Sequence, residues 1–274
     1  DVIVIVMSYL NTPWYVKQLQ QLSTPCRPGQ DPRRDPTRIL CQRPYEPEEG
    51  PAFYRVALPP ADRPGQSLAA LEPGQRPPTR PILGLTEAQI DEIAATPPFF
   101  TREPQAFRAG AIDTIVPAGT LMVPADLFLG LIITHSLGDR PIYFASTTQA
   151  YEELNLGAYL IRQGVALKLN NGPVRPDPAR GLFDISGSQL APVLGPTIDL
   201  PRTDSLLWNV FRHRNGFPDR WTRWVDAATQ GIPLYYAYTH VGAAYAHTLR
   251  GDSAMAARHM QRAEAFWRLG RGRR

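Results

Sequence analysis

The chain opens with a continuous apolar run, and this run predicts a buried strand. Residues 2–7 read Val-Ile-Val-Ile-Val-Met, without the alternation of apolar and polar residues that marks a half-buried strand. Such β-branched runs are typical of strands covered on both faces in a parallel sheet. Thr12 then suits the N-cap of a helix and Pro13 its first position. We therefore expect half of a strand–helix–strand unit, whose neighbouring strands lie later in the chain or upstream of Asp1.

Between residues 86 and 203 the pattern predicts further helices and strands. Thr86 and Gln89 match a capping box, which predicts a short helix ending near Ala95. Apolar spacing predicts a second helix over residues 125–136. Strands are predicted at 111–116, 120–123, 140–145 and 165–169, and another short helix at 148–154. Together with residues 1–23, this region predicts an α/β domain with a small, largely parallel sheet and flanking helices.

A proline-rich segment interrupts this domain. Fourteen of the 29 prolines lie between Pro25 and Pro81, and proline removes a backbone donor and blocks helices. We expect residues 24–85 to form a long, extended Pro/Arg-rich insert. Cys26 and Cys41 both lie in it, and in an oxidising compartment they could form a disulfide that contributes roughly 3 kcal/mol in the chain-entropy model. The spacing of the two cysteines alone leaves the bond open.

The last part of the chain, residues 204–268, turns helical. Gly251-Asp252 separates two periodic segments, and Ala256 and Ala263 follow seven residues apart, as in the second half of a tetratricopeptide repeat. One such helical hairpin cannot bury its own apolar face, so we expect it to pack on the preceding helices. Residues 269–274 form a basic tail.

Composition narrows the classes of partner. The formal net charge is +4, and 27 of the 29 basic residues are arginines. Nucleic-acid-binding proteins concentrate more charge than this on one face, so no nucleic-acid partner is expected. No run of about 18 apolar residues predicts a membrane-spanning helix. The sequence begins at Asp1, with no initiator Met and no signal-peptide pattern. We therefore expect Asp1 to be a cut end and not the native start.

Motifs for chemistry are few. The chain lacks a P-loop, a GxGxxG fingerprint after the first strand and a GxSxG elbow. His240 and His247 lie seven residues apart and could share a helix face, but no carboxylate or cysteine follows at a matching spacing. The sequence therefore predicts no catalytic residue, no metal site and no cofactor, and it favours a packing role for the two histidines.

Two groups of residues remain as binding candidates. Asn11 and Thr12 follow the first predicted strand, at the carboxyl end where open α/β sheets bind ligands, although a plain strand-to-helix turn is the simpler interpretation. Several tryptophans either belong to the core or are contacts to a protein partner. The arginines near the end of the chain either face solvent or contact an acidic partner or anionic lipid head groups. These interface candidates are Trp208, Trp221, Trp224, Arg268, Arg271, Arg273 and Arg274.

Four segments resemble a bacterial family of multi-pass membrane proteins. Residues 1–15, DVIVIVMSYLNTPWY, are similar to a family segment of the form DVRVVNLSLLNTDWY, and residues 139–145, DRPIYFA, are similar to its ERPIYFA strand. Residues 156–169 resemble a segment ending EGLAYRL, and residues 211–221 resemble an FKWG…PDVYLD segment. The family, long labelled as of unknown function, is grouped with protein O-mannosyltransferase-like glycosyltransferases of the GT-C type. The resemblance covers the chain except for the proline-rich insert.

The resemblance implies an extracytoplasmic α/β domain followed by helical hairpins. The family's membrane-spanning part, with its catalytic carboxylate, lies upstream of the matched segments, and Pro13 stands where the family has an acidic residue. No catalytic residue is therefore carried over.

The leading hypothesis is a non-catalytic, periplasmic accessory subunit, peripherally associated with a membrane protein complex that is respiratory, photosynthetic or part of the envelope. The alternative is the acceptor-binding or regulatory domain of a membrane glycosyltransferase. A hydrolase built on the Asn11 loop is a third, weaker hypothesis.

Overall fold

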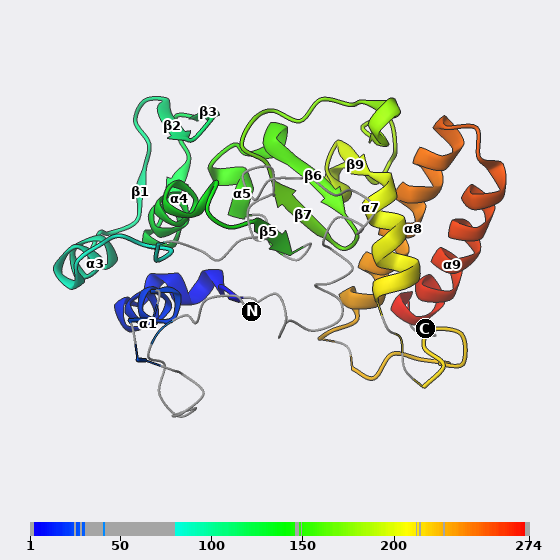
Figure 1. Cartoon of the computed structure of the whole chain (residues 1–274), viewed down its shortest axis with the longest axis horizontal. Coiled ribbons are helices and arrows are strands. Elements are labelled where there is room, and N and C mark those ends of the chain that lie inside the picture. The colour runs from blue at the N-terminus through cyan, green and yellow to red at the C-terminus, as the bar shows by residue number, and fades with distance from the viewer. Residues whose placement is uncertain are drawn as a thin grey trace. The chain divides into compact units, whose positions relative to one another are not determined.

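The computed structural model describes residues 3–24, 26–27, 29–30, 41, 80–145, 148, 150–211, 213, 215–226 and 228–271. The predicted insert therefore lies mostly outside the described residues. Contacts divide the chain into two units (Figure 1): unit 1 holds residues 1–142 and 150–156, and unit 2 holds residues 143–149 and 157–274. The boundary expected near residue 203 falls inside unit 2.

Unit 1 begins with an extended segment. Residues 3–6 join none of the sheets that the structure describes, and the 3₁₀ helix η1 follows at Met7–Asn11. Ile3 and Ile5 pack on the core of unit 1, whereas Val4 and Val6 are exposed. The predicted buried strand is therefore wrong. Every second side chain of this segment packs on the helices of unit 1, and the side chains between them face solvent. The segment is therefore covered on one face only, and by helices, not by a sheet.

Helices build the core of unit 1. They are α1 (Pro13–Ser23), α3 (Glu87–Ala94) and α4 (Pro124–Ser136). The short α5 (Ala150–Glu153) has no buried residue. Thr86 and Gln89 form the predicted capping box at the start of α3, which satisfies two backbone donors of the first turn. Leu10, Leu83 and Phe128 are fully buried where η1, the residues before α3 and α4 meet.

Two small antiparallel sheets complete unit 1. Strand β1 (Phe99–Phe100) pairs with β4 (Leu121–Met122), and β2 (Gln105–Ala109) pairs with β3 (Ile112–Val116). The strands predicted at 111–116 and 120–123 correspond to β3 and β4. The sequence analysis did not predict β2, whose side chains are mostly exposed.

Unit 2 is built on a five-stranded sheet in the order β5-β7-β6-β9-β8. Its strands are β5 (Ile142–Ala145), β6 (Leu160–Gln163), β7 (Ala166–Leu169), β8 (Leu182–Asp184) and β9 (Thr197–Asp199). Pairs β6·β7 and β8·β9 are antiparallel, and β6·β9 is parallel. The class is mixed α/β, as expected, but the sheet is not largely parallel. Gly164, at φ +58°, begins a two-residue turn between β6 and β7, and so short a connection joins only antiparallel strands.

A fully buried arginine fastens a short helix to this sheet. Arg162 on β6 donates from Nε to the Leu194 carbonyl at 2.9 Å and from Nη2 to the Val193 carbonyl at 3.1 Å. Both carbonyls lie at the end of α6 (Ala191–Leu194), where a helix leaves its last acceptors unpaired.

Among the described residues of unit 2, two short 3₁₀ helices lie between these elements, η4 (Gly157–Tyr159) and η5 (Pro178–Arg180).

Helices form the C-terminal part of unit 2. They are α7 (Leu200–Ser205), the π-helical η6 (Leu206–Val210), α8 (Gly231–Leu249) and α9 (Ser253–Arg271). Helices α8 and α9 lie side by side as a hairpin (Figure 1), so the predicted helical hairpin is present. Its relation to a tetratricopeptide repeat stays a prediction. Within the described parts of the chain, none of the helices has the length and apolar character to cross a bilayer.

Candidate functional site

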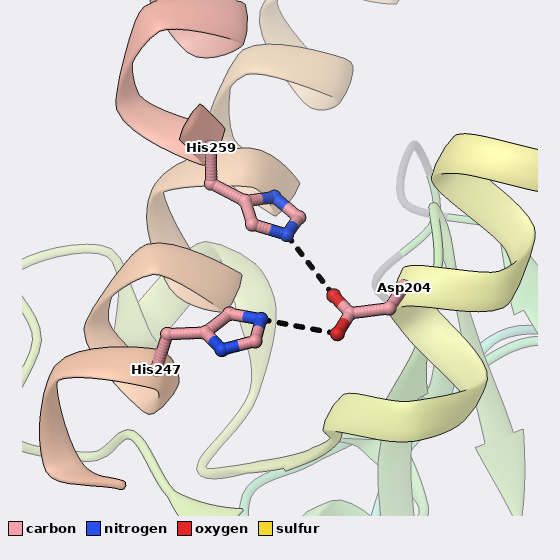
Figure 2. A group of neighbouring side chains, drawn as sticks. All are labelled: Asp204, His247 and His259. Atoms are coloured by element: carbon pink, nitrogen blue, oxygen red, sulfur yellow. Dashed lines mark hydrogen bonds and ion pairs between the residues drawn. The ribbon is translucent and has the colours of Figure 1, made fainter. Parts of the chain in front are cut away.

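Three polar side chains converge where α7, α8 and α9 meet in unit 2 (Figure 2). His247 Nε2 lies 3.0 Å from Asp204 Oδ2, and His259 Nε2 lies 3.0 Å from Asp204 Oδ1. One ligand atom from each of the three residues lies within 4.8 Å of the other two. The two imidazoles are 1% and 0% exposed, whereas the carboxylate is 23% exposed. Asp204 therefore forms the solvent-facing edge of a buried cluster.

The turn between α8 and α9 brings the two histidines together. Gly251 adopts φ +81°, a conformation that suits glycine, and the Asp252 N–H donates to the His247 carbonyl at 2.9 Å to close the end of α8. Asp252 Oδ1 then accepts from the Met255 N–H at 3.1 Å and caps the start of α9. The chain thus reverses within a few residues, and His259 comes to face His247.

Each histidine has a partner behind it. His259 Nδ1 lies 2.9 Å from His240 Nδ1, and the Trp208 indole Nε1 lies 3.1 Å from His259 Nε2. His247 Nδ1 lies 3.3 Å from Arg250 Nη2 and 3.6 Å from an Asp252 carboxylate oxygen. Of these partners, His240 Nδ1 and the Asp252 carboxylate can accept from the ring N–H that a metal-bound imidazole keeps, whereas Arg250 and Trp208 are donors.

The hydrogen bonds of His259 Nε2 cannot all be satisfied together. This nitrogen faces a donor, the Trp208 indole N–H, and an acceptor, the Asp204 carboxylate. If it carries a proton, it opposes the indole N–H, and if it does not, its lone pair opposes the carboxylate oxygen. Without an ion, His247 has no such conflict, because Nε2–H can donate to Asp204 while Nδ1 accepts from Arg250. An ion bound at Nε2 requires the other tautomer, in which Nδ1–H faces the Asp252 carboxylate at 3.6 Å.

Burial favours the neutral forms of His240 and His247. Desolvation, with the neighbouring His259 adding to it, lowers the pKa of His240 to about 3. Desolvation also lowers the pKa of His247, while the Asp204 carboxylate acts in the opposite direction. Neutral imidazole is the form that binds metal ions.

No protein-family model, curated protein or solved structure matches the chain. The chemistry of the cluster therefore rests on its own geometry. Two imidazoles and one carboxylate are donors that Zn²⁺ and other divalent transition metals accept, and three protein ligands leave a coordination position open.

A pocket of about 510 Å³ opens onto the cluster. Its polar and aromatic lining includes Asp204, Ser205, Trp208, Asn209, Arg250 and Arg258. The Arg258 guanidinium carbon lies 4.2 Å from the centre of the Trp208 ring, a cation–π distance. Of the three potential ligands, only Asp204 lines the pocket, so a molecule in it approaches the cluster from the carboxylate side.

The residues proposed at the first loop, Asn11 and Thr12, belong to unit 1, whereas the cluster belongs to unit 2. Asn11 Oδ1 accepts from the Ala125 N–H at 3.1 Å, at the start of α4, and Asn11 Nδ2 donates to the Ser8 carbonyl at 3.3 Å. The Thr12 hydroxyl donates to the Tyr9 carbonyl at 2.6 Å. Thr12 binds nearby backbone, whereas Asn11 also joins η1 to the first turn of α4, and these contacts give both side chains a structural role.

The interface candidates are distributed over several parts of unit 2. Trp208 belongs to the cluster, whereas Trp221 and Trp224 pack on Phe217 in the loop before α8. Arg268 is exposed on α9, and Arg271 ends this helix. Arg273 and Arg274 lie outside the described residues. The disulfide candidate is a bond in the structure: Cys26 and Cys41 are joined.

Sequence reasoning missed Asp204 and the part played by His259. The spacing of His240 and His247 indicated that they share a helix face, but the sequence showed no carboxylate at a matching spacing to complete a metal site. Asp204 lies 43 residues before His247, so no local spacing could reveal it. The one usable signal was the Gly251 turn, which predicts that histidines on either side of it face one another.

Proposed function

We propose that unit 2 binds one divalent transition-metal ion, with Zn²⁺ as the simplest case, through Asp204, His247 and His259. The observation that supports this most directly is the shared carboxylate: two buried Nε2 atoms lie 3.0 Å from its two oxygens. These donor types and this number are those of zinc sites with one open position.

The conflict at His259 favours an ion over a network of hydrogen bonds alone. A cation between His259 Nε2 and the Asp204 carboxylate removes the lone-pair repulsion of the unprotonated form. Because Nε2 has a single lone pair, the Trp208 indole N–H then gives up its hydrogen bond to this nitrogen. In this state His259 Nδ1–H donates to His240 Nδ1, which lies 2.9 Å away and is kept neutral by burial. His240 thereby acts as the outer partner that holds the ligand's tautomer.

The test is a titration of the chelator-treated, full 274-residue chain with Zn²⁺. We expect binding of one ion per chain and a higher melting temperature, because a ligand at 100 times its dissociation constant stabilises the folded state by about 2.7 kcal/mol. Asp204→Asn and His247→Gln should each weaken binding by about 10-fold or more. His135→Gln, on α4 in unit 1, is the matched control and should bind as the wild type does.

The wild-type titration decides the proposal even if a variant fails to fold. Absence of stoichiometric Zn²⁺ binding by folded wild-type protein would overturn it. Binding that survives both Asp204→Asn and His247→Gln would place the ion elsewhere and would equally overturn it. Co²⁺ in place of Zn²⁺ adds a visible absorption band that reports the coordination geometry directly.

We further propose that the chain is an extracytoplasmic accessory subunit docked on a larger membrane protein assembly. The disulfide between Cys26 and Cys41 supports this location, because such bonds persist in oxidising compartments. In unit 1, the side chains of Tyr9 and Trp14 are 52% and 61% exposed with ring centroids 6.4 Å apart, and exposed aromatic pairs are typical interface anchors. The alternative proposal is that the chain is a regulatory or acceptor-binding domain of a membrane glycosyltransferase, which would also account for the disulfide and the exposed aromatic pair.

Purification from detergent-solubilised membranes of the native host tests the accessory role. We expect the tagged chain to elute with integral-membrane proteins in one defined complex, and Trp14→Ser to reduce its recovery there. Phe100→Ser, at an exposed apolar position elsewhere in unit 1, is the control. Recovery of the wild-type chain only as a free monomer would contradict the proposal, and a membrane part in the same polypeptide would support the alternative.

A further inference from the structure

The pocket over the cluster lies where an external ligand can reach a bound ion. Of the three proposed metal ligands, Asp204 is the one that lines the pocket, and its carboxylate is the exposed edge of the site. Both histidines lie behind it at 1% exposure or less. The open coordination position of a metal held by these three residues therefore faces this pocket.

The charge of the pocket depends on whether the ion is present. Arg250 and Arg258 line it. Arg250 pairs with Asp252 at 2.9 Å, and within the described part of the chain Arg258 has its contact with the Trp208 ring and no carboxylate partner. Asp204 and Asp252 together balance the two guanidinium groups. A divalent ion leaves an excess of about two positive charges, which suits a dianion.

The size and lining of the pocket indicate more than a bare anion. Its volume of about 510 Å³ is in the range of sites for small organic molecules. Trp208 and Met255 offer apolar surface, while Ser205 and Asn209 offer hydrogen-bonding groups. Such a lining suits a charged head attached to an organic group.

We infer that this pocket binds a phosphomonoester, with one phosphate oxygen at the metal's open position and the remaining charge held by Arg250 and Arg258. This inference rests on the proposed metal site. Guanidinium groups bind phosphate oxygens in a bidentate manner, and a dianionic phosphate matches the excess charge better than a carboxylate does.

The experiment is a calorimetric titration of the full chain with phenyl phosphate, with and without bound Zn²⁺. We expect the Zn²⁺-loaded protein to bind phenyl phosphate at least about 10-fold more tightly than the chelator-treated protein, and phenyl phosphate to tighten Zn²⁺ binding by the same factor. Inorganic phosphate should bind more weakly because it lacks the organic group, and benzoate more weakly because it carries a single charge.

Variants separate this inference from the metal site. Arg258→Ala should weaken phenyl phosphate binding by about 10-fold or more while Zn²⁺ affinity stays within about twofold. Arg268→Ala removes an exposed arginine from the same helix outside this pocket and should leave both affinities unchanged.

Each alternative outcome has a separate meaning. If Zn²⁺ binds and phenyl phosphate does not, this inference fails and the metal site stands. If Zn²⁺ does not bind, both fail. Equal phenyl phosphate binding with and without Zn²⁺, or tighter binding of benzoate than of phenyl phosphate, would overturn the assignment of a metal-bound phosphomonoester.

Discussion

At the scale of single residues, His213 is a half-buried titratable group that the proposed metal site does not use. Its ring packs edge-on against Phe217, Tyr236 and Phe266, at centroid distances of 5.2–5.5 Å. Its Nε2 atom is buried and has no hydrogen-bond partner among the described residues. A histidine in such an apolar setting resists protonation, and its protonation state therefore affects the stability of the fold.

This residue should make the fold less stable in acid. Desolvation, with Arg262 adding to it and Asp219 opposing it, lowers the pKa of His213 from its ordinary value of 6.5. Below pH 6.5 the unfolded chain therefore binds more protons at His213 than the folded chain does. The contribution of neutral His213 to the free energy of unfolding is present above this pH and is lost as the pH falls.

We expect the free energy of unfolding, measured with urea on chelator-treated protein, to fall between pH 7.5 and pH 5.5. His213→Phe should reduce this pH dependence, and His240 and His247 should account for part of what remains. One proton contributes at most about 1.4 kcal/mol per pH unit. A variant that keeps the full wild-type slope would contradict this role for His213.

At the scale of elements, helix α8 packs closely on the sheet of unit 2 and on α6 through small residues. Ala243 and Ala246 of α8 are fully buried against a cluster that includes Ile198 of β9. Gly242 lies beside them, and a Cβ atom at this position would come within 2.6 Å of Leu194 Cδ1 at the end of α6. Leu194 is 1% exposed, and Arg162 binds its carbonyl, so it has little freedom to move.

Gly242→Ala should therefore destabilise the protein despite the better helix propensity of alanine. The propensity gain is about 1 kcal/mol, whereas overpacking a buried contact costs about 1–3 kcal/mol. We expect a net loss of about 1 kcal/mol in urea unfolding. Gly231→Ala, where the added Cβ would lie 3.7 Å from a Tyr235 ring atom, is the control and should be neutral or slightly stabilising. Equal behaviour of the two variants would argue against close packing at Gly242.

At the scale of the whole molecule, each unit has its own core and a separate set of features. The Cys26–Cys41 disulfide and the exposed Tyr9–Trp14 pair belong to unit 1, whereas the proposed metal site and its pocket lie entirely in unit 2. The two proposed functions are therefore carried by different parts of the chain. Substitutions that test docking and those that test metal binding can be made without sharing a residue.

Elements with local signals were predictable, and those defined by distant partners were not. The capping box at Thr86 and the apolar spacing over residues 125–136 each predicted a helix that is present, because both signals act within a few residues. Strands β8 and β9 lie in a proline-rich stretch for which the sequence predicts a loop. Each has three residues, which are too few to show the alternation of apolar and polar side chains that predicts a strand, and their pairing partners lie elsewhere in the sequence.

By itself, the sequence determined the helix that begins with the capping box at Thr86, the helix over residues 125–136 and the two helical segments on either side of Gly251. Only the tertiary structure decided that the apolar run at residues 3–6 stays outside a sheet, and that Asp204 meets His247 and His259. The physical reason is the range of the interactions. Capping and periodicity act within one or two helical turns, whereas a metal-binding set or a strand pair depends on how separate elements pack.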